Sequence, residues 1–249
     1  KVLTGSSVLQ VSLSSSHSCA LTSELTIYCW GQNNNGQLGD GTTVTRTVPV
    51  ALRGISDMIP VMVSTGYYTT CILFINGSVG CIGNSPQGQY GDGLFSNDAG
   101  NELHWVQFPI GRHAISLDVG YEHSCAILDD QSLVCWGSNS NGQLGTGNAT
   151  NEHQAIPKVA LNSTHQVIGV SSGNLNTCAW TENGTAYCWG LNNYGQLGLG
   201  NTTQMDVPYK IRNHNDGKVR NVVSIDTSSR NTCVLYDDFA VRCWGYNTN

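Results

Sequence analysis

Short runs of apolar, β-branched residues recur along the chain, and each run ends in small residues and glycine. Residues 61–63 and 222–225 are two of these runs. Short strands bounded by turns have this pattern. No apolar run approaches the roughly 18 to 20 residues that span a bilayer, so we expect no membrane insertion within this segment. The pattern predicts an all-β protein.

The same arrangement of residues occurs five times. The period is 52 to 55 residues, and the units begin near Val8, Pro60, Ala114, Val167 and Val222. Each unit supplies about three or four strands, which are too few to bury both faces of a sheet, and stacking the units around an axis solves that problem. We therefore expect a single β-propeller domain over residues 1–249, with repeats at about 8–59, 60–113, 114–166, 167–221 and 222–249.

A glycine-rich motif closes the complete units. In the first unit it runs from Trp30 to Gly41 as Trp-Gly-Gln-Asn-Asn-Asn-Gly-Gln-Leu-Gly-Asp-Gly, and it returns without insertion at residues 136–147 and 189–200. The second unit keeps the spacing but differs at three motif positions, which hold Ile82, Ser85 and Tyr90. The second unit is therefore a diverged blade and not a missing one.

Every unit also contains one pair of cysteines with nine residues between them, and no cysteine is left over. The pairs are Cys19 and Cys29, Cys71 and Cys81, Cys125 and Cys135, Cys178 and Cys188, and Cys233 and Cys243. In two units the midpoint of the pair is an asparagine followed by glycine, at Asn76 and Asn183. This predicts a three-residue hairpin loop whose third residue is left-handed.

A loop of this length places the two cysteines of a pair directly opposite each other. With Thr181 and Thr185 as the hydrogen-bonded closing pair, Cys178 and Cys188 fall at a non-hydrogen-bonded position, where a cross-strand disulfide fits. Zinc sites use cysteines about two to four residues apart and bring four ligands together, and no such set of cysteines occurs here. Free, buried thiols are the remaining alternative. The recurrence of the pair in every unit favours five disulfides and an oxidising compartment.

Charge narrows the range of partners. Charged residues make up 11% of the chain, and the net charge is −6. Binding to a phosphate backbone or to an anionic leaflet needs a basic surface, so we expect neither nucleic acid nor a membrane surface as a partner.

Five Asn-x-Ser/Thr sequons offer acceptor sites for N-linked glycans, at Asn76, Asn148, Asn162, Asn183 and Asn201. Two of them fall at predicted hairpin tips, and Asn148 and Asn201 follow the same motif glycine in two units, so these four should be exposed. Together with the disulfides they predict an extracellular protein, with glycans attached if the source is eukaryotic.

The repeated unit resembles the regulator-of-chromosome-condensation repeat. The resemblance rests on Cys-Ala-Leu before the hairpin, on Cys-Trp-Gly-x-Asn-x-x-Gly-Gln-Leu-Gly-x-Gly after it, and on His-Ser before the first cysteine at His17 and His123. It implies four-stranded blades, usually seven, in a ring that strands from both chain ends close. Because the fifth unit stops at Asn249, we expect two further blades outside the numbered residues, the alternative being a smaller ring closed by the strand near Val8. The cysteine pairs resemble secreted relatives and depart from the best-known intracellular members.

Most of the repeated side chains have a structural interpretation. Packing between blades explains Trp30, Trp136, Trp189 and Trp244 better than a binding ring does, and bonding to turn backbone explains Gln37, Gln89, Gln143 and Gln196. His17 and His123 occupy a repeat position that is not histidine in the other units, which favours a structural role over a catalytic one. Asp40 and Asp92 share a position that the other units do not keep acidic, so we expect no metal site, and no motif indicates a cofactor.

The stretch from 94 to 112 is not repeated, and it contains aromatic residues among polar ones, namely Phe95, Trp105 and Phe108. Aromatic anchors on a variable loop suit a contact surface. A loop that packs its aromatic residues against its own blade is the competing interpretation.

These observations favour a binding or assembly module over an enzyme. The leading expectation is an extracellular scaffold or adhesive component that binds another protein or copies of itself. A secreted enzyme inhibitor is an alternative. A guanine-nucleotide exchange factor, the activity best known for the family that the repeat resembles, is less favoured because such a factor must meet a cytosolic or nuclear GTPase.

Overall fold

The computed structural model describes residues 5–55, 57–148, 152–156, 161–211 and 220–247, and these ranges form five antiparallel sheets. Within each sheet the strands neighbour one another in chain order. Each sheet corresponds to one predicted repeat and is called a blade below. The all-β prediction is confirmed. In the described ranges no helix is long and apolar enough to cross a bilayer.

Four blades have four strands each, and the fifth has three. The first blade contains β1 (Val8–Leu13), β2 (His17–Thr22), β3 (Ile27–Gly31) and β4 (Arg46–Ala51). The second contains β5 (Pro60–Thr65), β6 (Thr69–Phe74), β7 (Val79–Ser85) and β8 (Ser96–Trp105). The third contains β9 (Ala114–Val119), β10 (His123–Leu128), β11 (Leu133–Gly137) and β12 (Glu152–Ile156).

The fourth blade follows a short 3₁₀ turn, η1 (Ser163–His165). It contains β13 (Val167–Ser172), β14 (Asn176–Thr181), β15 (Ala186–Gly190) and β16 (Met205–Lys210). The fifth contains β17 (Val222–Thr227), β18 (Asn231–Tyr236) and β19 (Val241–Gly245).

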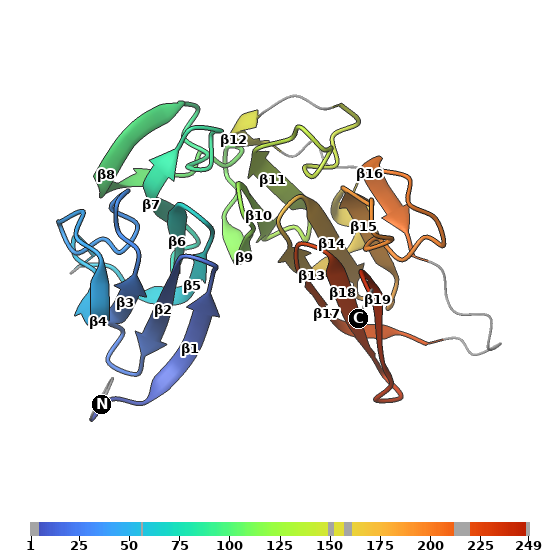
Figure 1. Ribbon diagram of the computed structural model, residues 1–249, viewed down its shortest axis with the longest axis horizontal. Coiled ribbons are helices and arrows are strands. Elements are labelled where there is room, and N and C mark those ends of the chain that lie inside the picture. Colours follow the sequence, from blue (N-terminus) through green and yellow to red (C-terminus); the bar gives the residue numbers. More distant parts are fainter. Residues whose placement is uncertain (1–4, 56, 149–151, 157–160, 212–219, 248–249) are drawn as a thin grey trace.

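The blades stand side by side in an arc, with β1 at one end and β17 to β19 at the other (Figure 1). The first strands of consecutive blades contact each other. These strands, β1, β5, β9, β13 and β17, therefore form the inner edge of the arc. Four apolar clusters fill the spaces between adjacent blades. This is the propeller architecture that the repeat predicts.

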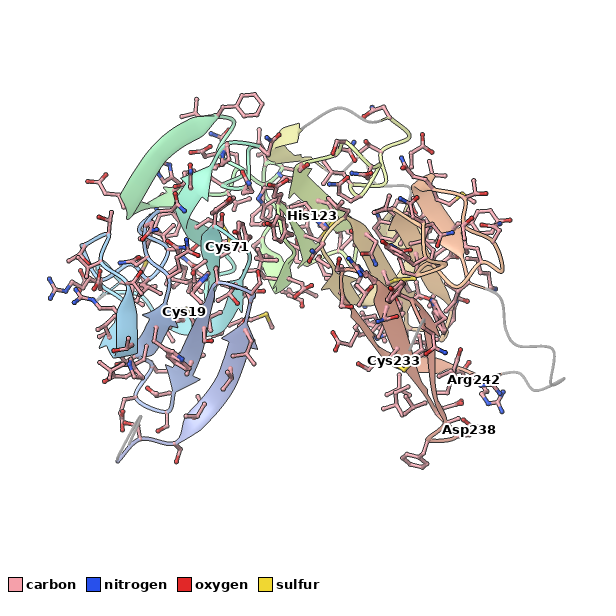
Figure 2. The ribbon with its side chains drawn as sticks, in the orientation of Figure 1. Cys19, Cys71, His123, Cys233, Asp238 and Arg242 are labelled. Atoms are coloured by element: carbon pink, nitrogen blue, oxygen red, sulfur yellow. A yellow bond between two sulfur atoms is a disulfide. The ribbon has the colours of Figure 1, made fainter. Side chains whose placement is uncertain are left out.

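The two central strands of every blade form a hairpin that a disulfide joins. In all five hairpins the two cysteines are direct partners in register, with a Cα–Cα distance of 4.1 Å. Cys19, Cys71 and Cys233 accordingly lie in separate blades in Figure 2. The five pairs and their register match the prediction, and free cysteines are absent from the described residues.

The hairpin loop is the predicted one, including in blades that lack its glycine. Gly77 and Gly184 have φ values of 76° and 74° at the third loop position. The other three blades place ordinary side chains in the same left-handed region, and these are Leu25 (φ 59°), Gln131 (φ 62°) and Phe239 (φ 62°). The register of the strands thus imposes the turn even where a side chain opposes it.

The motif tryptophans pack between blades. Trp136 and Trp189 are fully buried, and their indole N–H groups donate to the carbonyls of Gln89 and Gln143 in the preceding blade, each over 2.8 Å. The Thr177 hydroxyl donates to the same Gln143 carbonyl over 2.8 Å. The structural interpretation of the tryptophans is confirmed at these positions.

The motif glutamines bond to turn backbone, as predicted. In each complete motif the side-chain oxygen accepts the N–H of the residue two positions earlier, over 2.8 to 3.0 Å; the four glutamines are Gln37, Gln89, Gln143 and Gln196. Each glutamine therefore shapes its own loop with the side chain and holds the next blade with the backbone carbonyl.

Candidate interaction site at the axial mouth

The turns between the first and second strands of all five blades surround one hollow of about 240 Å³, which we call the mouth. Each turn is a two-residue loop, closed in the second blade by a hydrogen bond of 2.7 Å from the Gly66 N–H to the Thr69 carbonyl. These loops form the rim of the mouth, and the first residue of each loop lines the hollow. In blade order the loop residues are Ser15 and Ser16, Tyr67 and Tyr68, Tyr121 and Glu122, Asn174 and Leu175, and Ser229 and Arg230.

Glycines allow neighbouring turns to come into contact. A Cβ atom on Gly66 would lie 2.5 Å from the Gly120 carbonyl oxygen, and one on Gly120 would lie 2.3 Å from the Gly173 carbonyl oxygen. Because glycine has no side chain, the turns come close enough to form hydrogen bonds with each other. The Tyr67 N–H donates to the Tyr121 carbonyl over 3.2 Å. The Tyr121 N–H donates to Gly173 over the same distance. Backbone hydrogen bonds therefore join the turns of the second, third and fourth blades into one platform.

Three tyrosines gather on the rim where the second and third blades meet. The rings of Tyr67 and Tyr121 stack with centroids 4.3 Å apart and planes 16° apart. Tyr68 meets Tyr67 edge-on, with centroids 4.2 Å apart. All three side chains are partly exposed. An aromatic surface of this kind suits a contact with another molecule.

Glu122 lies beside this tyrosine cluster and is half-buried. Burial raises the pKa of its carboxyl above the ordinary range. Within the described residues the carboxyl has no hydrogen-bond or ion-pair partner. Burial also raises the pKa of Tyr121 to about 12, and contacts with Tyr67 and the negative charges around it add to that effect. This part of the rim is aromatic and carries a negative electrostatic potential.

A second aromatic cluster lies at the fourth and fifth blades and contains its own cation. The Arg230 guanidinium lies 5.2 Å from the ring centroid of Tyr194 and 5.1 Å from that of Tyr246. Those two rings meet edge-on with centroids 5.0 Å apart. Arg230 occupies the turn position that Glu122 occupies in the third blade, so the same place in the repeat carries opposite charges in the two clusters.

Two buried histidines fix the blades behind the rim. The Thr70 and Thr177 hydroxyls donate to carbonyls of the preceding blade, so each accepts a hydrogen bond from a histidine Nε2–H, over 2.6 Å from His17 and 2.8 Å from His123. Burial lowers the pKa of both imidazoles to about 4. His123 lies near the middle of the arc in Figure 2. The expectation that these histidines are structural is confirmed.

A belt of hydrogen bonds joins the inner strands below the mouth. In successive blades one side chain accepts a backbone N–H of the next blade, over 3.0 Å from Val119 to Ser64 and from Thr227 to Ser171. Asp118 replaces serine at this position and accepts the Ser172 N–H over 2.5 Å. Burial raises the pKa of Asp118 to about 6, against the effect of these hydrogen bonds.

The acidic motif residues have partners in the protein. Asp40 forms a salt bridge of 2.6 Å with Arg46, and Asp92 lies 2.9 Å from the His104 imidazole. In the described ranges no three side chains of the metal-binding types come together.

The three aromatic residues predicted as a contact surface divide between two environments. Phe108 packs against the core and meets Trp136 edge-on with centroids 6.1 Å apart. Phe95 and Trp105 remain 53% and 42% exposed, although Trp105 also contacts Phe74. The structure therefore keeps two of the three accessible and brings none of them to the mouth lining.

All five sequon asparagines are exposed. Asn76 and Asn183 lie at hairpin tips, which are at the opposite ends of the strands from the mouth. Asn148 and Asn201 lie in the loops that follow the third strands, on the side of the mouth.

Sequence reasoning missed the tyrosine cluster. The two residues that precede the His-Ser, Thr-Thr or Asn-Thr segment differ in every unit, from two serines to two tyrosines, so the repeat pattern averages them out. A usable signal exists, because Tyr67 and Tyr121 occupy the same offset in consecutive units.

Comparison with known protein families identifies the same repeat. Models of the regulator of chromosome condensation (RCC1) repeat match residues 26–73, 132–180 and 183–235, and a second model of the repeat matches 8–37, 114–143 and 167–196. The chain is 30% identical over 250 residues to the ultraviolet-B receptor UVR8 of Arabidopsis thaliana, covering all of this chain and 55% of that protein. The chain thus spans about half the length of that relative.

Solved structures show the same fold at low identity. Human WBSCR16 superposes with a TM-score of 0.85 at 20% identity, over 98% of this chain and 64% of that one. The ectodomain of the Arabidopsis thaliana receptor kinase ACR4 superposes with a TM-score of 0.58 at 18% identity, over 98% of this chain and 65% of that one. The repeat matches cover well over half of the residues, and the chain belongs to the regulator of chromosome condensation (RCC1) repeat family.

Proposed function

We propose that this chain is part of an extracellular scaffold that binds another protein, or copies of itself, through the rim of the mouth. The observation that carries the proposal is the partly exposed cluster of Tyr67, Tyr68 and Tyr121 on a hydrogen-bonded platform. Tyrosine supplies large contact area at a low cost in conformational entropy, and it is enriched at protein interfaces. A rigid frame beneath it reduces the ordering cost of binding.

The disulfides and sequons support the extracellular location. Five disulfides, four of them completely buried, indicate an oxidising environment during folding. All five acceptor asparagines are accessible to a glycosylating enzyme. The likeness to a receptor-kinase ectodomain is compatible with this location. The same compartment disfavours exchange activity on a small GTPase, and we propose a binding role instead of a catalytic one.

The test uses the chain produced through a eukaryotic secretory pathway, with peptide mapping under non-reducing conditions to verify the five disulfides. Beads coated with the protein are then scored for aggregation with one another and for attachment to cells of the source tissue. We expect aggregation or attachment that decreases when Tyr67→Ser and Tyr121→Asn are combined, since these are the residues of the first and fourth blades at that position. Beads that neither aggregate nor attach would contradict the proposed role.

A second candidate is a secreted inhibitor that inserts an aromatic edge into the cleft of an enzyme. The exposed Phe95 and Trp105 near the ends of β8 favour it. Substitution of both by serine would abolish such binding and leave binding at the mouth unchanged, so the two candidates separate in one experiment.

A further inference from the structure

The two aromatic clusters on the mouth side of the molecule differ in one respect. The fourth and fifth blades place Arg230 between Tyr194 and Tyr246, so that cluster already holds a cation. The second and third blades place Glu122 beside Tyr67, Tyr68 and Tyr121, and within the described residues no cation lies over these rings or pairs with Glu122. The cluster of Tyr67, Tyr68, Tyr121 and Glu122 thus has the surroundings of a cation site, and among the described residues the chain supplies no cation to it.

We propose that the rim formed by Tyr67, Tyr68, Tyr121 and Glu122 binds an arginine side chain of the partner protein. This deepens the binding role proposed above and rests on it only for the identity of the partner as a protein. Tyrosine ring faces carry negative potential, which attracts a guanidinium ion and does not attract an anion. The half-buried Glu122 carboxylate supplies the counter-charge and can accept hydrogen bonds from the planar guanidinium group.

The electrostatics at the rim favour a cation over a neutral or anionic group. Burial disfavours the charged form of Glu122 and raises its pKa, and the pKa values of Tyr68 and Tyr121 rise partly through the nearby Glu122 charge. A cation bound here would relieve both effects, whereas a neutral sugar would leave the carboxylate without a counter-ion. A bound anion would add to the repulsion.

The molecule itself shows that the repeat can hold an arginine in this way. Arg230 and Glu122 occupy the same turn position of their blades, and the Arg230 guanidinium lies within 5.2 Å of two tyrosine ring centroids. That cluster therefore holds an arginine against tyrosine rings within one chain. The other contains the rings and the opposite charge, and the partner supplies the cation.

The arginine probe is N-acetyl-arginine amide, and the neutral comparison is N-acetyl-citrulline amide, which has nearly the same shape without the charge. Each is titrated into the disulfide-intact chain, followed by NMR resonances of the tyrosine rings. We expect the arginine probe to shift the Tyr67, Tyr68 and Tyr121 resonances saturably in the roughly millimolar range, since a single side chain provides little binding energy. The citrulline probe should shift them at least several-fold less.

Four variants sharpen the result. Glu122→Gln should weaken binding of the arginine probe several-fold, and Glu122→Arg should abolish it, because it copies the arrangement of Arg230. Tyr121→Phe should retain binding because the ring remains. Glu182→Gln, which removes an exposed carboxylate at a hairpin tip far from the mouth, is the matched control and should change nothing.

Equal shifts with both probes, or arginine shifts that survive Glu122→Gln, would overturn the inference. These outcomes are independent of the proposed scaffold function. If bead aggregation or cell attachment persists in Glu122→Gln while the arginine probe fails to bind, the cation site is wrong and the scaffold role stands. If the arginine probe binds as described but the beads attach to nothing, the scaffold role fails and the cation site stands.

Discussion

The Trp180 ring lies directly over Gly169, its partner across β13 and β14. A Cβ atom on Gly169 would lie 1.9 Å from Cζ2 of that ring, closer than any two carbon atoms can pack. The φ angle of Gly169 is not in the left-handed region, so glycine is required here for space and not for backbone conformation. In the other blades the second-strand partner is leucine or isoleucine, and the first-strand partner has a side chain between serine and methionine in size: Gln10 and Leu21, Met62 and Leu73, Ser116 and Ile127, and Ser224 and Leu235.

The first prediction is that Gly169→Ser destabilises the protein by about 2 kcal/mol, because the added side chain must displace the indole. Trp180→Leu alone should also destabilise it, by leaving a void beside Gly169. The double variant Gly169→Ser with Trp180→Leu copies the fifth blade and should recover much of the loss. Chemical denaturation of the four proteins as a double-mutant cycle measures the coupling. Additive effects of the two changes would contradict the packing argument.

The second prediction concerns the order in which the disulfides are reduced. Cysteines of the first four pairs have no exposed surface, whereas Cys233 and Cys243 in the last blade are partly exposed. Thiol–disulfide exchange requires a thiolate to reach a sulfur atom, so access controls the rate in the folded protein. Under mild reduction, we expect alkylation to label Cys233 and Cys243 before the interior pair Cys178 and Cys188. Simultaneous labelling, measured by mass spectrometry, would show that global unfolding and not exposure controls reduction.

The repeats, the blade boundaries and the hairpin disulfides were all predictable from the sequence. Cysteine spacing fixes the register of a hairpin, and an Asn-Gly at its midpoint fixes the loop, so local chemistry determines both. The loops that contain Leu25, Gln131 and Phe239 show how far repetition extends this logic. None of those residues favours a left-handed conformation, and only alignment with the glycine-containing blades indicates the turn.

The mouth was not predictable in the same way. Its shape depends on glycines such as Gly120, whose missing side chain matters because a neighbouring blade approaches within bonding distance. Stacking of Tyr67 on Tyr121 depends on the angle between two blades, which no single repeat encodes. The space that Gly169 leaves for Trp180 is also invisible until the strands are paired. Contacts across blades therefore need coordinates, whereas contacts within a hairpin do not.

The third prediction concerns the strained hairpin loop of the fifth blade. Phe239 has a left-handed φ of 62° and is 88% exposed, so its side chain contributes almost no packing. Left-handed backbone costs about 1 to 2 kcal/mol for a residue with a Cβ atom, and a glycine at this position avoids that cost. Part of the gain is offset because glycine also increases the conformational entropy of the unfolded chain. Phe239→Gly should therefore raise the free energy of unfolding by roughly 0.5 to 1 kcal/mol.

The opposite substitution in the fourth blade is the matched comparison. Gly184 has a φ of 74°, and a Cβ atom there would lie 2.4 Å from Cβ of Asn221. Gly184→Ala should accordingly destabilise the protein, both through the backbone and through the clash. Thermal unfolding under non-reducing conditions measures both variants. A Phe239→Gly protein that is no more stable than the parent would show that the loop conformation costs little.

The fourth prediction is a dependence of stability on pH that comes from Asp118. Burial raises the pKa of this carboxyl to about 6, the nearby Asp226 charge raises it further, and hydrogen bonds from Ser172 and Val119 oppose the rise. In the unfolded chain the pKa is near the ordinary value of about 4, so between about pH 4 and 6 the folded state binds more protons than the unfolded state. The contribution of Asp118 to stability is therefore complete below about pH 4 and is lost as the pH rises through about 6.

Asp118→Ser isolates this effect, because serine accepts the same inter-blade hydrogen bond at Ser64 and Ser171. Relative to the variant, the parent protein should lose up to about 2 kcal/mol of stability between pH 4 and 6, a value reduced by the partial exposure of the carboxyl. Above pH 6 the difference should be constant. Other carboxyl groups titrate in both proteins, so the difference between the two denaturation curves is the quantity to measure. A difference that does not change between pH 4 and 6 would mean that the fold does not raise the pKa of Asp118. The belt of hydrogen bonds would then hold a charged carboxylate near neutral pH without an energetic penalty from burial.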